Sequence, residues 1–90
     1  MKKFYVLMKD YQEDFDYGTV PLMVTDDYFK VRNYFETLIS ERVKEHPEWD
    51  IDDNRVYFFQ QHHPDDTGDF YRLQIQVWTP NSRDFTEEML

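Results

Sequence analysis

The run DDYFKVRNYFETLISERVKEH, residues 26–46, constrains the fold most, because it is the longest stretch with the period of a helix. Its apolar side chains recur at steps of three and four residues, and Arg42 falls on their side: Val31, Phe35, Leu38, Ile39 and Val43. Lysine, asparagine, threonine and glutamate occupy most of the opposite side. The pattern predicts an amphipathic helix, which needs a second layer of structure against which to bury its apolar stripe.

The ends of this helix are marked in the sequence. Thr25 or Asp26 is a suitable N-cap, because its side-chain oxygen can accept the first unpaired backbone N–H groups. Pro47 predicts a stop near His46, since the residue before a proline avoids helical backbone angles.

Four other segments are predicted to be strands: residues 3–9, 19–24, 55–62 and 70–79. The last alternates most clearly, with apolar residues at 71, 73, 75 and 77 and Arg72, Gln74 and Gln76 between them. Pro21 places the second strand at a sheet edge, because proline lacks a ladder donor. Residues 10–18 and 48–54 are expected to be charged connections, with Trp49 and Ile51 turning inwards.

The order strand, strand, helix, strand, strand predicts one α+β domain over residues 1–90. We expect a four-stranded, mainly antiparallel sheet with the helix on one face and a short helical turn over residues 84–90. The uncovered face would then carry aromatic side chains from Tyr5, Tyr57 and Phe59 beside Arg72, Gln74 and Gln76.

The charge of the chain limits its partners. Lysine and arginine total 10 against 19 aspartates and glutamates, so the net charge is -9. Nucleic acid and anionic membranes are poor ligands for such a protein, because binding them depends on cationic side chains. A basic protein partner, or solubility alone, accounts for the charge better. With no cysteine and no long apolar run, we expect a cytoplasmic protein.

The sequence offers little for catalysis or metal binding. Ser40 and Ser82 lack a glycine-framed turn, and Gly18 and Gly68 are typical of turns and not of phosphate loops. Residues 50–61 begin like a calcium loop but lack its glycine and its final glutamate. His62, His63 and the aspartates after them fit a polar hairpin loop better than a metal site. We therefore predict a non-enzyme with no catalytic residue, metal or cofactor.

Acidic and aromatic residues are interleaved in two stretches, and these are the predicted partner-binding residues. The first set is Asp10, Asp14, Phe15, Asp16 and Tyr17, and the second is Asp50, Asp52 and Asp53. In an extended segment, residues two apart lie about 7 Å from each other on one side, a spacing comparable to that of phosphates along a nucleic acid strand. Aromatic side chains between them can anchor a protein interface. An ordinary solvated acidic surface remains the alternative.

In general character, short, acidic, aromatic-rich and free of cysteine, the chain is similar to small inhibitor proteins of phages and mobile elements. The leading hypothesis is a binding protein that docks an acidic and aromatic surface on a basic protein. If that protein binds nucleic acid, the chain would act as a DNA mimic and inhibit it. The alternative is an assembly subunit that forms a homodimer through the outer sheet face or an edge strand.

Overall fold

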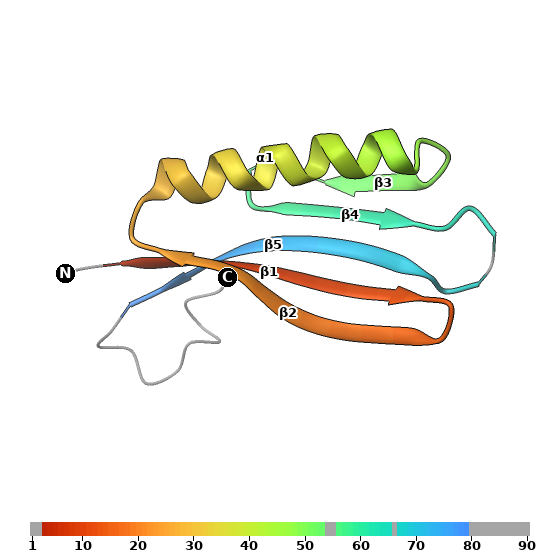
Figure 1. Ribbon diagram of the computed structural model, residues 1–90, viewed down its shortest axis with the longest axis horizontal. Helices are drawn as coiled ribbons and strands as arrows, with labels where there is room; N and C mark the ends of the chain where they lie inside the picture. Colours follow the sequence, from red (N-terminus) through yellow and green to blue (C-terminus); the bar gives the residue numbers. More distant parts are fainter. Residues whose placement is uncertain (1–2, 54–55, 66, 80–90) are drawn as a thin grey trace.

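The computed structural model describes residues 3–53, 56–65 and 67–79, which form one helix and one five-stranded sheet (Figure 1). The elements follow the chain in the order β1 (Phe4–Glu13), β2 (Asp16–Thr25), α1 (Tyr28–Glu45), β3 (Asp50–Asp53), β4 (Phe58–His62) and β5 (Phe70–Trp78). The predicted α+β class is confirmed, whereas the predicted number of strands is wrong. The segment expected to be an acidic loop forms β3, which pairs with β4. The helical turn expected over residues 84–90 lies outside the described residues.

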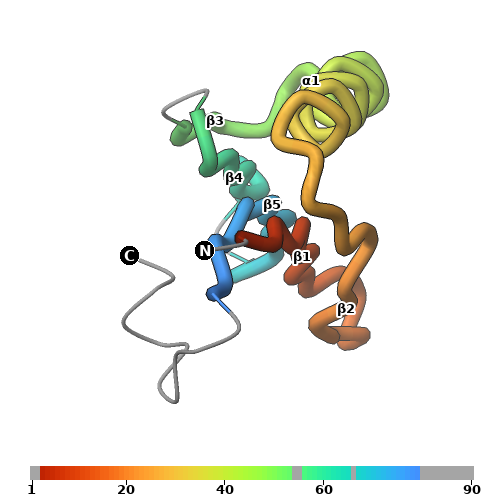
Figure 2. The backbone as a smooth tube through the Cα atoms, turned by 90° about the vertical axis from the view of Figure 1, so that its left-hand side faces the viewer, coloured from red at the N-terminus to blue at the C-terminus, as the bar shows by residue number. Residues whose placement is uncertain are grey.

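Every strand is antiparallel to its neighbours, and the sheet order is β2-β1-β5-β4-β3. The helix lies on one side of this sheet, as the view along the strands shows (Figure 2). It connects β2 and β3, which are the two edges. Pro21 therefore lies in an edge strand, as its missing donor predicts.

The core lies between α1 and the three central strands, β1, β5 and β4. Its buried side chains come from all four elements: Leu7, Val31, Phe35, Ile39, Phe59, Leu73 and Ile75. Phe35, Phe59 and Leu73 are completely excluded from solvent. Each such side chain contributes about 1.5–3 kcal/mol relative to an exposed one. The helical stripe and the alternation in β5 therefore predicted most of this core.

Two details of the helix and its surroundings differ from expectation. The N-cap is Asp27, whose Oδ1 accepts from the backbone N–H groups of Phe29 and Lys30. Thr25 lies two residues before this N-cap, and its Oγ1 accepts from the N–H of Asp27. At the other end Trp49 is buried as predicted, but Ile51 is 45% exposed because β3 is an edge strand.

Among the described residues, no helix is long and apolar enough to cross a membrane.

The expected composition of the outer sheet face is partly wrong. Tyr5 shares the face of buried Leu7, two residues along β1, and Phe59 is itself in the core, so both aromatic side chains lie on the helix side. Tyr57 precedes β4 in a bend. Alternation along β1, β4 and β5 places four other aromatic residues on the outer face: Phe4, Phe58, Phe70 and Trp78. The pairing register also places Arg72, Gln74 and Gln76 there, as predicted.

Candidate functional site

Three connections meet at one end of the molecule: the β1–β2 turn, the α1–β3 connection and the β4–β5 loop (Figure 1). Residues from all three line one depression: Glu13, Asp14, His46, Glu48, Trp49, His63 and Asp69. Most of these side chains are acidic. We call this end of the molecule the acidic end. The β1–β2 hairpin places four of the five residues of the first predicted set at this end: Asp14, Phe15, Asp16 and Tyr17.

The β1–β2 hairpin closes with a turn of two residues, where the sequence suggested a long connection. β1 continues to Glu13, β2 begins at Asp16, and these two residues pair. Asp14 and Phe15 between them have φ values of 50° and 71°. Positive φ at both central residues defines a type I′ turn, which normally carries asparagine and glycine. The turn also means that Asp14 and Asp16 do not share one extended segment, so that part of the spacing argument is wrong.

Among the large hydrophobic side chains that the structure describes, that of Phe15 is the most exposed. Its exposed fraction is 101%, and Tyr17, two residues further on, is 77% exposed. A bulky residue at positive φ is an uncommon, strained choice that costs on the order of 1 kcal/mol or more. Since the Phe15 ring is fully exposed, packing among the described residues does not offset that strain.

Acidic side chains surround this turn. Asp14 borders three depressions, which also include Glu13, Asp16, Glu48 and Asp69. Asp14, Asp16 and Glu48 are exposed, and the C-terminal end of α1 faces the same end of the molecule. The carbonyl groups at a helix C-terminus carry partial negative charge, so they strengthen the negative field of these carboxylates.

Arg42 of α1 connects residues of several elements beneath the surface of the acidic end. Its guanidinium donates to Gln61 Oε1 at 3.0 Å and to Glu13 Oε1 at 2.8 Å. It also stacks on the rings of Tyr71 and Trp49, at 4.3 Å and 4.8 Å from their centroids. Arg42 is only 9% exposed, so its charge is satisfied by this one carboxylate and these polar and aromatic groups.

Gln61 and Trp49 extend this cluster towards the loops. Gln61 has no exposed surface, and its amide nitrogen donates to the carbonyl oxygen of His46 at the end of α1. The ring of Trp49 lies between the rings of His46 and His63, with centroids 5.0 Å and 5.1 Å away. The α1–β3 connection and the β4–β5 loop are therefore packed against each other through one buried tryptophan.

Burial also affects the titration of Tyr71. Its removal from water raises the pKa of the phenol above the ordinary value of 10.0, because the ionised form is the less well solvated one, although the charge of Arg42 opposes this shift. Tyr71 therefore stays neutral beside Arg42 throughout the physiological pH range.

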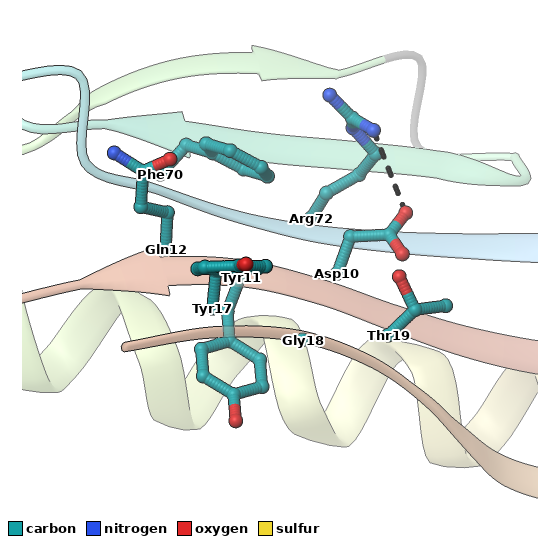
Figure 3. Close-up of a pocket in the computed structure, with 8 residues that line it drawn as sticks. All are labelled: Asp10, Tyr11, Gln12, Tyr17, Gly18, Thr19, Phe70 and Arg72. Atoms are coloured by element: carbon teal, nitrogen blue, oxygen red, sulfur yellow. Dashed lines mark hydrogen bonds and ion pairs between the residues drawn. The ribbon is translucent and has the colours of Figure 1, made fainter. Parts of the chain in front are cut away.

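Asp10 is not part of the acidic end, although it was predicted together with the turn residues. Its side chain lies on the outer face beside Arg72, with the Arg72 guanidinium 3.4 Å from Asp10 Oδ2 (Figure 3). Arg72 also donates to Gln60 Oε1 at 2.8 Å and covers the ring of Phe70. Asp10, Phe70 and Arg72 line a shallow depression of about 450 Å³ together with residues of the β1–β2 hairpin, among them Gln12, Tyr17 and Thr19. Because Asp10 is already paired, it is a weak candidate for binding a cationic partner.

The second set of predicted residues lies at the opposite edge of the sheet. Asp50, Asp52 and Asp53 belong to β3, whereas Asp16 and Tyr17 belong to β2. Four strand spacings separate these edges, roughly 19 Å. Asp50 and Asp52 do share one side of an extended strand, as expected. The two sets nevertheless form two separate surfaces.

Sequence reasoning missed the cluster around Arg42. Arg42 was placed on the apolar side of the helix, and this position was the one available signal that it is buried. Nothing in the sequence showed that Gln61 and Glu13 would meet it from two different strands. In the described residues, no group of three or more histidine, aspartate or glutamate side chains could hold a metal ion.

The chain was also compared with known proteins. The comparisons with family models, with curated proteins and with solved structures return no match.

Proposed function

We propose that this protein binds a basic protein partner through the β1–β2 turn, with Asp14, Phe15, Asp16 and Tyr17 as the contact residues. One observation supports the proposal most: the Phe15 side chain is fully exposed at a strained backbone position. Aromatic anchors contribute a large share of binding energy at protein interfaces, and surrounding charges speed and orient the encounter.

The surrounding carboxylates define the chemistry of the partner. Glu13 and Asp14 border two adjoining depressions, of which one also includes Asp16 and the other includes Glu48 and Asp69. The nearby Arg42 is buried and paired. A partner surface rich in arginine and lysine complements this end. Where the partner is a nucleic-acid-binding protein, docking here would occupy its phosphate-binding surface and inhibit it by competition.

The experiment compares two charge reversals that change the net charge equally. The variant Asp14→Lys/Asp16→Lys alters the turn, and Asp50→Lys/Asp52→Lys alters the far edge. Each replaces two negative charges by two positive ones, so both move the net charge from -9 to -5. Tagged proteins capture partners from a lysate of the source cells at low salt, and captured proteins are then eluted with high salt or with duplex DNA.

We expect the turn variant to lose the salt-sensitive partner and the edge variant to retain it, because the contact is local. Release by duplex DNA identifies the partner as a nucleic-acid-binding protein. Equal loss in both variants would show that only net charge matters. Unchanged capture by the turn variant would show that the site is elsewhere.

A third variant separates strain from binding. Asp14→Asn/Phe15→Gly installs the residues that a type I′ turn prefers, so the free energy of unfolding should rise by about 1 kcal/mol. Partner capture should fall at the same time, because the aromatic anchor is gone. A variant that is more stable and still binds would remove Phe15 from the proposed contact.

A further inference from the structure

The two edges of the sheet differ in how they are protected from other strands. In β3 three of four residues are aspartates. In β2, by contrast, residues 17–24 carry no charged side chain, although 32% of the whole chain is charged. Val20 and Val24 on this edge are 39% and 63% exposed. Natural edge strands are usually blocked by charge, so within the part of the chain that the structure describes β2 is an open edge from Tyr17 to Val20, ahead of Pro21.

The register of the hairpin shows which backbone groups face outwards. Glu13 and Asp16 close a two-residue turn, so this pair exchanges hydrogen bonds within the hairpin. Antiparallel pairs alternate, so Gly18 bonds to β1, whereas the N–H and C=O groups of Tyr17 and Thr19 face away from it. Pro21 is two residues beyond Thr19, so by the same alternation its backbone groups also face away from β1, and its missing N–H interrupts no bond to β1. Its position agrees with the assigned alternation.

We infer that two copies of this chain pair through β2, antiparallel, around a two-fold axis at Gly18. Tyr17 then lies opposite the partner's Thr19, and the reverse pair is formed by symmetry. Both are hydrogen-bonded pairs, so four N–H···O bonds join the two sheets into one of ten strands.

Gly18 suits the axis position. The ring of its neighbour Tyr11 covers it, with the hydroxyl oxygen 3.1 Å from the point where a Cβ would lie. At the axis the two copies of Gly18 face each other with no side chain on either face of the sheet. On the outer face, the exposed ring of Tyr17 gains a neighbour in the partner's Thr19.

Moving the two-fold axis by one residue, to Thr19 or to Tyr17, gives a less stable pairing of the two β2 strands. A two-fold axis at Thr19 places Tyr17 opposite the partner's Pro21, which has no N–H to donate. With the axis at Tyr17, the two Asp16 residues lie two positions apart, about 8 Å from each other including the strand spacing. With the axis at Gly18, this separation increases to about 14 Å, beyond the Debye length of about 8 Å at physiological salt. The Gly18 register thus avoids both the missing donor and the like-charge contact.

The test uses sedimentation equilibrium of the full chain from 10 μM to 1 mM in 0.15 M and 0.5 M salt. We expect a dimer at high micromolar concentration that persists at 0.5 M salt, since no opposite charges hold it. Thr19→Pro removes one outward N–H per copy and no bond to β1, so it should weaken dimerisation at least tenfold. Thr19→Val is the matched control and should dimerise within threefold of the wild type.

Amide hydrogen exchange provides a readout that does not depend on any variant. The N–H groups of Tyr17 and Thr19 should exchange fast in dilute protein and at least tenfold more slowly at high concentration. Those of Gly18 and Val20 bond to β1 and should be protected at both concentrations. A wild type that is monomeric at 1 mM, or a dimer that survives Thr19→Pro, overturns the inference. Monomeric Thr19→Pro retains the β1–β2 turn, so its partner capture tests the proposed function separately.

Discussion

Arg42 and Arg72 lie on opposite faces of one sheet and have the same kinds of neighbour. Each donates to a glutamine of β4, Gln61 or Gln60, and forms an ion pair with a carboxylate of β1. Each also covers an aromatic ring of β5. The difference is burial, because the side chain of Arg42 is 9% exposed and that of Arg72 is 33% exposed.

Similar contacts therefore do not imply that the two ion pairs contribute equally to the free energy of unfolding. Water competes for the groups around Arg72, so its pair with Asp10 should contribute little. Around Arg42, the side chains of Trp49, Gln61 and Tyr71 exclude water, and Gln61 has no other partner for its amide oxygen among the described contacts. Removing Arg42 therefore leaves a buried acceptor unsatisfied, which is costly.

The largest effect is expected for Arg42→Met. The change leaves Gln61 Oε1 buried without a donor and removes the contacts to Tyr71 and Trp49. We expect the free energy of unfolding to fall by about 2–3 kcal/mol, measured by urea denaturation. The double variant Arg42→Met/Gln61→Leu should recover part of this loss, because it replaces the buried polar pair by apolar groups. No recovery would mean that shape, and not the unsatisfied oxygen, decides the cost.

A smaller effect is expected for Arg72→Met. Solvent can reach Gln60 and Asp10 once the guanidinium is gone, so the loss should stay below about 1 kcal/mol and shrink further in 0.5 M salt. Urea denaturation at two salt concentrations provides the measurement. A loss as large as that of Arg42→Met would contradict the role given to burial.

The smallest expected effect is a dependence of the free energy of unfolding on pH, which Tyr71 beside Arg42 should produce and Phe70 beside Arg72 should not. Burial raises the pKa of Tyr71 above that of the unfolded chain, near 10. The associated stability is fully present below pH 10 and is lost as pH rises through the folded-state pKa, because the unfolded chain gives up this proton first. Wild type should therefore lose stability relative to Tyr71→Phe above pH 10, but not between pH 7 and 9. Urea midpoints of both proteins at these pH values test this. A Phe70→Leu control keeps the Tyr71 phenol and should follow wild type.

The sequence predicted the parts of the fold that depend on one segment at a time. The stripe of Val31, Phe35 and Ile39 defined the helix, and the alternation around Leu73 defined β5. Strand β3 was missed because aspartates rarely form strands, and Asp50–Asp53 does so only because β4 lies beside it. The extent of the β1–β2 hairpin was missed for a related reason, since Asp14 and Phe15 lack the sequence of a two-residue turn.

The candidate site was predictable as a list of residues but not as a surface. Asp14, Phe15, Asp16 and Tyr17 do lie together. Asp10 was grouped with them by sequence distance, yet alternation along β1 turns it towards Arg72 on the outer face. Glu48 and Asp69 come close to the turn only because three loops meet at one end, which depends on the order of strands in the sheet.

That strand order also has a consequence for synthesis of the protein. β1 is made before the other strands of the sheet, but one of its two neighbours is β5, the last of them. The pairing of Phe4 with Trp78 therefore joins residues that are far apart in the sequence. On the ribosome, β1 and β2 can form a hairpin, yet the sheet cannot close until β5 has emerged. Contacts so distant in sequence slow folding, so the nascent hairpin should be the species that needs protection from aggregation.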